Sequence, residues 1–298
     1  MKNVLITVIG TTACGKSDLA IKLARYFDGE IISADSRQVY KGLDLGTGKV
    51  TEEEQSLVKH HLIDILEPGT PYSAAEFQND AYKAIDDVIA RGKLPILCGG
   101  TGLYSRAVVE GYDFSDAPPS DELRAELAGK SREELLAILS THSITDIDPQ
   151  KSNRHLIRMI EKVADGRPHI PQNCPKYDVL QLGMTFERQI LLDRIKLRLE
   201  ARIKAGMIEE VKGLMENGVT SEFLEGLGLE YRYTYRYLAG MYDSYDAYFE
   251  QLNTEINKFS KRQMTWFRKE KDVVWLDMNG DFESQAVEEV KRFLVKHN

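Results

Sequence analysis

Residues with strand and helix character alternate in blocks along the first third of the chain. Short runs with strand character occupy 4–9, 30–33 and 94–98, with HLIDIL at 61–66 as a further candidate. Helical periodicity covers about 16–27 and 73–91, and the second stretch ends at Gly92, a residue typical of helix termini. Strand, helix and strand at this spacing predict right-handed crossovers and a parallel sheet.

The middle of the chain follows a different pattern. Residues 113–167 open with DFSDAPPSDE and then contain no convincing strand, so we predict an all-helical insertion there. After it come a strand at 178–184, long amphipathic helices over about 187–217 and 229–264, a last strand at 272–277 and a closing helix at 283–297. The pattern therefore predicts an α/β core in two parts, 1–112 and 168–298, divided by the insertion.

The first predicted strand runs into a sequence that fits GxxxxGK[ST] and opens a helix. The loop consists of Gly10, Thr11, Thr12, Ala13, Cys14, Gly15, Lys16 and Ser17. Such a loop wraps backbone N–H groups around a phosphate, as in proteins that bind nucleotides such as ATP. We expect Lys16 to reach the terminal phosphates, Ser17 to hold Mg²⁺ and Cys14 to line the turn. We therefore predict a P-loop NTPase-like parallel sheet flanked by helices. The alternative is that the loop is only a tight structural turn.

A carboxylate follows the second predicted strand. All carboxyl ends of a parallel sheet lie on one edge, so Asp35 is expected beside the phosphate loop. There it could accept a proton from a nucleophile, or it could simply cap the following turn. The 94–98 strand ends at the same edge, where Gly99-Gly100 permits close backbone approach and Thr101 can cap a helix or donate to a ligand.

Charge and composition limit the class of protein. The 39 Lys and Arg residues against 47 Asp and Glu give a net charge of −8, which argues against a general nucleic-acid coat protein but allows local basic patches. Three distant cysteines form no zinc motif, and no apolar run approaches the roughly 20 residues of a membrane span. Without an export signal at the N-terminus, we expect a cytoplasmic protein that acts away from membranes.

Three groups of basic residues are candidates for anion binding. Arg194, Arg198 and Arg202 recur every four residues on one predicted helix, which indicates either a nearby anion or a solvated face. A second group, Lys151, Arg154, His155, Arg158 and Lys162, lies in the insertion. A third group, spanning 258–271, interleaves bases with Trp266 and Phe267. Such stretches suit an RNA backbone with unstacked bases, or are ordinary charged helix surfaces.

Six motifs, in order and with their spacing kept, resemble the tRNA dimethylallyltransferase (tRNA isopentenyltransferase) family from about residue 5 to 277. They are GTTACGKS, ADSRQVYKGLDLGTGK (34–49), HHLIDILEP (60–68), YSAAEFQNDA (72–81), LPILCGGTGLY (94–104) and KRQMTWFRKE (261–270). The second and the last are far more specific than the phosphate loop.

The resemblance implies a chemistry. The phosphate loop would bind dimethylallyl diphosphate rather than ATP, and the prenyl group would go to the exocyclic amine of the adenine just 3′ of the anticodon. Mg²⁺ would assist departure of the diphosphate. By the same resemblance, Asp35 takes the proton of the amine, Thr101 lies near the reacting adenine, and Arg198 clamps the diphosphate. The family pattern has Gly-Tyr-Lys/Arg-Glu near 226–236, where this chain reads GLGLEYRYTYR, so that contact is not transferred.

The resemblance also implies an RNA-binding set for the anticodon stem-loop of tRNA. It comprises Asp35, Ser36, Arg37, Gln38, Thr101, Arg124, Arg154, His155, Leu156, Ile157, Arg158, Arg262, Gln263, Trp266 and Arg268. His155 stands where the family usually has Arg, which predicts a weaker or pH-dependent contact. We expect a monomer. The alternatives are a transferase acting on free adenine nucleotides, a P-loop kinase of a small metabolite, and a non-catalytic RNA-binding protein.

Overall fold

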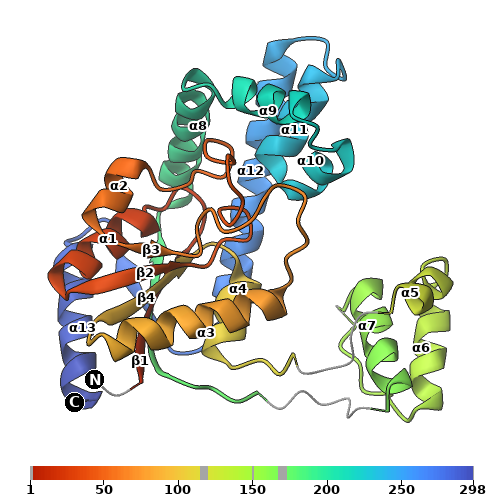
Figure 1. The fold of residues 1–298 in the computed structure, drawn as a ribbon, viewed down its shortest axis with the longest axis horizontal. Coiled ribbons are helices and arrows are strands. Elements are labelled where there is room, and N and C mark those ends of the chain that lie inside the picture. Colours follow the sequence, from red (N-terminus) through yellow and green to blue (C-terminus); the bar gives the residue numbers. More distant parts are fainter. Residues whose placement is uncertain (1–2, 115–119, 150, 167–172, 298) are drawn as a thin grey trace. The chain divides into compact units, whose positions relative to one another are not determined.

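The computed structural model describes residues 3–114, 120–149, 151–166 and 173–297. In these residues six strands form one sheet in the order β3-β2-β4-β1-β5-β6, with every neighbouring pair parallel (Figure 1). The strands are β1 (Val4–Gly10), β2 (Gly29–Ser33), β3 (His60–His61), β4 (Leu94–Gly99), β5 (Asp178–Thr185) and β6 (Val273–Asp277). The predicted α/β parallel sheet is confirmed.

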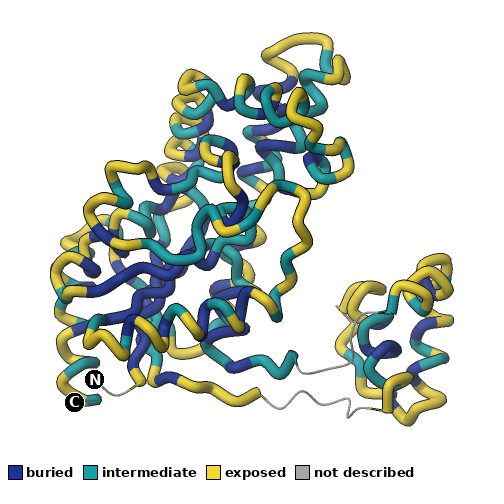
Figure 2. Tube along the Cα trace, viewed as in Figure 1, coloured by how far each residue is buried: buried dark blue, intermediate teal, exposed yellow. Residues whose placement is uncertain are grey.

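Helices cover both faces of the sheet. Val4, Ile6 and Val8 of β1 pack into a core with α1 (Lys16–Tyr26) and α13 (Phe282–His297). Leu5 faces the opposite core, which is built with α3 (Ala74–Ala90) and α4 (Gly102–Val109). Because both faces are covered, β1 is buried along its whole length (Figure 2), and its sequence is apolar on both faces except at Thr7.

Three predicted elements are wrong in extent. The predicted strand at 61–66 contributes only His61 to the sheet, because Leu62 and Asp64 adopt positive φ angles of 61° and 55° and break the ladder. The predicted helix over 187–217 is interrupted at Gly206, and that over 229–264 at Gly240, where φ is 109° and 75°. The observed helices there are α8 (Arg188–Lys204), α9 (Met207–Glu216), α11 (Leu229–Leu238) and α12 (Tyr245–Phe267).

The helices that follow β5 support the loops at the carboxyl edge of the sheet. Ala13 of the phosphate loop packs in one cluster with Leu191 and Ile195 of α8 and with Leu252 of α12. The segment after β2 packs in a second cluster with α9, α10 (Ser221–Leu227) and α11. Helix α2 (Glu52–Leu57) begins with a capping box at Thr51. The loops that carry the chemistry are therefore packed against helices from distant parts of the sequence.

Residues 110–175 form a second compact unit, separate from the unit made of 1–109 and 176–298. Its helices are α5 (Asp121–Leu127), α6 (Arg132–Thr141) and α7 (Asn153–Ala164). They enclose a core of their own that includes Leu135, Leu139 and Leu156 (Figure 2). The predicted insertion, 113–167, falls within this unit. Within the described ranges of the whole chain, no helix is both long and apolar enough to cross a membrane.

Candidate functional site

The phosphate loop connects β1 to α1 in the geometry that the motif requires. A Cβ atom on Gly10 would lie 2.7 Å from both the Cys14 sulfur and the Met184 carbonyl oxygen, so only glycine fits there. Gly15 caps α1 with φ of 85°, in the left-handed region that favours glycine. Cys14 is fully buried beneath the turn, which agrees with a lining role.

A pocket of about 540 Å³ opens over the start of α1. Its lining residues are Ala13, Gly15, Lys16, Ser17, Asp18, Gly48, Lys49, Val50, Glu54, Arg194, Leu197, Arg198 and Arg202. The arginine row of α8 thus lines a cavity at the phosphate loop instead of lying on a freely solvated helix face. Lys49 contributes little free charge to it, because its ammonium group is paired with Asp44 and Asp64.

Two of these arginines are attached to the phosphate loop itself. Arg194 donates from Nε to the Ala13 carbonyl oxygen at 2.8 Å and stacks over the Phe186 ring. Arg198 donates to the Thr12 hydroxyl. Burial, followed by the positive charge of Arg202, lowers the pKa of Arg198 to about 9. Among the described residues neither Arg194 nor Arg198 forms an ion pair with a carboxylate. Arg194 is exposed and Arg198 is partly buried, so this end of the pocket is a cationic site suited to an anion.

Arg202 shares a buried carboxylate with Arg37. Glu230 lies 3.4 Å from Arg202 and 3.6 Å from Arg37, and its side chain is 9% exposed. Both guanidinium groups lie against glycines: a Cβ atom on Gly48 would be 1.5 Å from Arg202 Nη2, and one on Gly228 would be 2.4 Å from Arg37 Nη1. Glu230 lies in the GLGLEYRYTYR segment, which departs from the family pattern and for which the resemblance implied no contact.

The same helical region anchors the loop at 44–46. The Glu210 carboxylate accepts the backbone N–H groups of Asp44, Leu45 and Gly46 at 3.1, 2.7 and 3.1 Å. It also accepts the Tyr231 hydroxyl at 2.7 Å, and burial is the main reason why the pKa of Tyr231 is raised. Sequence reasoning missed Glu210, because an isolated Glu on an amphipathic helix has no local signature.

Asp35 and Thr101 come together at the carboxyl edge of the sheet. Asp35 accepts the Arg37 backbone N–H at 2.9 Å through one oxygen, and its other oxygen has no hydrogen bond within the described residues. The Thr101 hydroxyl accepts the Ser36 N–H at 3.3 Å, and the Thr101 N–H donates to the Ala34 carbonyl at 3.4 Å. Asp35 thus caps the turn with one carboxylate oxygen, while the other could still accept a proton.

Gln38, the last of the four consecutive residues predicted to face the RNA, is engaged with the protein. Its side-chain oxygen accepts the Ser33 hydroxyl at 3.1 Å, and its amide nitrogen donates to the Gly48 carbonyl at 3.2 Å. These bonds tie the end of β2 to the loop that lines the anion pocket. An RNA contact through this side chain would have to share or replace them.

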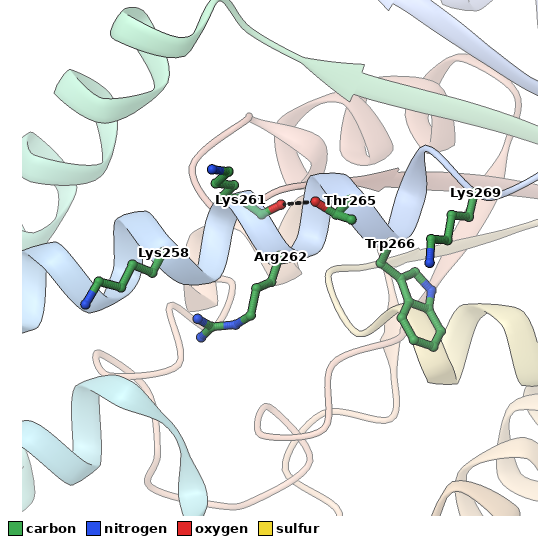
Figure 3. Close-up of a pocket in the computed structure, with 6 residues that line it drawn as sticks. All are labelled: Lys258, Lys261, Arg262, Thr265, Trp266 and Lys269. Atoms are coloured by element: carbon green, nitrogen blue, oxygen red, sulfur yellow. Dashed lines mark hydrogen bonds between the residues drawn. The ribbon is translucent and has the colours of Figure 1, made fainter. Parts of the chain in front are cut away.

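The basic segment of α12 has two faces. The outer face lines a pocket of about 430 Å³ formed by Lys258, Lys261, Arg262, Thr265, Trp266 and Lys269 (Figure 3). Trp266 lies 4.8 Å from the Arg106 guanidinium, which also pairs with Glu270. Arg268 is exposed. Gln263, in contrast, is buried and points inward, where it contacts Thr12 and Gly100.

In the second unit, two of the predicted RNA contacts already have a protein partner. Arg124 and Arg158 lie 2.8 and 2.9 Å from Glu161, whose side chain is 1% exposed. Burial by itself raises the pKa of Glu161, but hydrogen bonds from both arginines and a backbone N–H leave it below its ordinary value. Both arginine side chains remain partly exposed.

The start of α7 presents the other residues of this predicted set. Arg154 and His155 are exposed, and His155 Nδ1 is 2.8 Å from the Ser152 hydroxyl. Leu156 is fully buried in the core of the unit, and Ile157 is partly buried. The Leu156 side chain is therefore not available to an RNA, because helical periodicity turns it inward while Arg154 and His155 face the solvent.

Comparison with known proteins decides the family. The IPP transferase model matches residues 38–270. The chain belongs to the IPP transferase family. It is 46% identical to tRNA dimethylallyltransferase 2 of Shewanella sediminis over 97% of this chain and 98% of that relative. It is 44% identical to tRNA dimethylallyltransferase 2 of Porphyromonas gingivalis over 89% of both chains.

Solved structures agree. The tRNA isopentenylpyrophosphate transferase of Bacillus halodurans superposes with a TM-score of 0.75 at 34% identity, covering 99% of this chain and 96% of that one. A eukaryotic dimethylallyltransferase acting on tRNA has the same fold, with a TM-score of 0.82 at 23% identity, and covers all of this chain and 80% of that one. The family resemblance based on the six motifs is confirmed, and so is the P-loop fold class.

Proposed function

We propose that this protein transfers a dimethylallyl group from dimethylallyl diphosphate to the exocyclic amine of the adenosine 3′ of the anticodon in tRNA. The observation that carries this proposal is the row of arginines that lines the pocket at the phosphate loop, in a member of this family. A new N–C bond forms at the prenyl carbon while its C–O bond to diphosphate breaks. The amine proton goes to Asp35, and diphosphate leaves.

Departure of the diphosphate concentrates negative charge at the phosphate loop. The amides at the start of α1 and Lys16 meet that charge from one side, and Arg194 and Arg198 from the other. Cations that are already held in place by the protein stabilise such charge without reorganising. Arg202 completes the row, although part of its charge is balanced by Glu230.

The residues at this pocket fit a magnesium ion that is bound largely through the diphosphate. Ser17 lines the pocket, and no group of three His, Cys, Asp or Glu residues among the described ranges could cage a metal. Mg²⁺ commonly takes few protein ligands and completes its shell with water and substrate phosphates. Bound at Ser17, it would neutralise charge on the leaving diphosphate.

The acceptor side is supported by the geometry of two adjacent loops. Asp35 has one carboxylate oxygen without a hydrogen bond to any described residue, and the Thr101–Ser36 hydrogen bond holds the two loops together. The target adenine must leave its stack to reach this edge, as in other enzymes that modify a base. We propose that the outer face of α12 and the exposed residues of the second unit hold the RNA. With a net charge of −8, such binding should weaken steeply with salt.

The test uses labelled dimethylallyl diphosphate, Mg²⁺ and undermodified tRNA, with AMP and ATP as controls. We expect label in tRNA for the wild type and a loss of about a hundredfold or more in kcat for Asp35→Asn, the scale of general-base catalysis. Asp193→Asn is the matched control, because Asp193 is exposed and bonds only Gln189 among the described residues. Label in AMP, or phosphate transfer from ATP, would refute the proposal.

A further inference from the structure

We propose that Gln263 is a positioning residue that couples the RNA-facing helix α12 to the diphosphate loop. This inference rests on the proposed function and concerns how its two substrate sites communicate. The family resemblance groups Gln263 with the RNA contacts, but the structure turns it the other way. It lies between Arg262 and Met264 on the buried face of α12, and it is 8% exposed.

The amide of Gln263 bridges two loops of the active site. Its side-chain oxygen accepts the Thr12 backbone N–H at 2.8 Å, and its nitrogen donates to the Gly100 carbonyl at 2.9 Å. The sequence separation of these partners from Gln263 is 251 and 163 residues. One side chain therefore joins the diphosphate loop to the loop that carries Thr101.

The chemistry of this bridge requires an amide. One end must accept and the other must donate, which a carboxylate or a thioether cannot do. The surroundings are also tight: a Cβ atom on Gly100 would lie 2.9 Å from the Gln263 nitrogen and 3.6 Å from Lys16 Nζ. Lys16 and Gln263 thus lie next to the same glycine, which places the bridge beside the phosphate-binding lysine.

The outer face of the same helix segment is the basic pocket of Arg262, Trp266 and their neighbours (Figure 3). Trp266 packs on Gly102, where a Cβ atom would be 2.3 Å from the indole nitrogen. An RNA bound on the outer face therefore holds a rigid helix whose inner face fixes both loops. Because such coupling is reciprocal, diphosphate bound at Thr12 should in turn strengthen RNA binding through Gln263.

The experiment compares Gln263→Met with Arg262→Met, a change of the neighbouring residue on the outer face. Calorimetry measures the Kd of inorganic diphosphate with Mg²⁺, and filter binding measures the Kd of tRNA with and without that diphosphate. We expect Gln263→Met to weaken diphosphate binding by about fivefold or more, the scale of one lost hydrogen bond. Its tRNA affinity without diphosphate should stay within about twofold, while Arg262→Met should show the reverse pattern.

A second variant separates positioning from packing. Gln263→Glu keeps the acceptor but places a negative charge beside Gly100 and the diphosphate, so it should weaken diphosphate binding more than Gln263→Met does. A purely structural role would lower the melting temperature of both variants and leave the two Kd values unchanged, which would overturn the inference. Weakened tRNA binding in Gln263→Met without diphosphate would also overturn it. If the wild type transfers no prenyl group yet shows these Kd patterns, the proposed function fails and the positioning role stands.

Discussion

Arg198 is a partly buried cation whose contacts include a hydroxyl but, among the described residues, no carboxylate. We expect Arg198→Met to stabilise the ligand-free protein and to abolish its response to diphosphate. The guanidinium is kept in this position for an anion, not for the fold. Removing it therefore relieves a cost that the folded chain otherwise carries.

The magnitude follows from two opposing effects. Lowering the pKa of Arg198 from its ordinary value to about 9 corresponds to an upper bound of about 5 kcal/mol against folding, at about 1.4 kcal/mol per pKa unit. Relaxation and water penetration reduce such penalties to about 2–3 kcal/mol. Losing the bond to the Thr12 hydroxyl costs about 1 kcal/mol. The net prediction is a gain of about 1–2 kcal/mol in the free energy of unfolding.

The pH dependence has a definite sign. A base with a lowered pKa in the folded state binds fewer protons there than in the unfolded chain. The penalty is therefore complete below pH 9 and is relieved as pH rises from about 9 toward the ordinary pKa of arginine. At neutral pH the wild type carries all of it, so the comparison is made at pH 7.

Urea unfolding of wild type and Arg198→Met, each with and without inorganic diphosphate and Mg²⁺, measures the effect. Diphosphate at a hundred times its Kd should stabilise the wild type by about 2.7 kcal/mol and the variant by almost nothing. Arg292→Met is the control, because Arg292 is 70% exposed on α13 and its loss should change stability by less than about 0.5 kcal/mol. A variant that is destabilised and still responds to diphosphate would refute the reasoning.

Two further predictions concern buried carboxylates. Glu230→Gln should lower the free energy of unfolding by about 1–3 kcal/mol, because Arg202 and Arg37 lose the charge of their shared partner. Added diphosphate should increase the stability of this variant more than that of the wild type. An unchanged urea midpoint would contradict this prediction. Glu30 has a pKa lowered to about 2, mainly by its hydrogen bond with Arg91, so its contribution is present above pH 4.5 and is lost as pH falls through 2. Unfolding of Glu30→Gln between pH 5 and 2 should show a shallower decline than the wild type, and equal slopes would contradict this.

Several features of the site follow directly from local sequence. The phosphate loop is a contiguous motif, and its glycines and lysine serve neighbouring atoms. Asp35 and Thr101 could be placed because parallel strands share one carboxyl edge. The arginine row followed from helical spacing, which puts every fourth residue on one face.

Other features depend on partners that are distant in the chain. Leu62 and Asp64 end β3 through positive φ angles that the apolar pattern of HLIDIL does not reveal. Periodicity across 187–217 and 229–264 continued through Gly206 and Gly240, where the observed helices stop. Periodicity records which face is apolar, but it is insensitive to a single left-handed residue that redirects the chain.

The sequence by itself determined the family, the parallel sheet and the residue types at the carboxyl edge, since these depend on short-range order and motif spacing. Tertiary structure decided the direction in which side chains of one motif point. Gln263 turns inward while its neighbour Arg262 turns outward, and Leu156 is buried next to the exposed His155. It also decided which arginines have carboxylate partners, because Glu230 reaches Arg37 across 193 positions (230 − 37) only after the helices have packed. Pairing of charges across such separations is set by packing and not by local propensity.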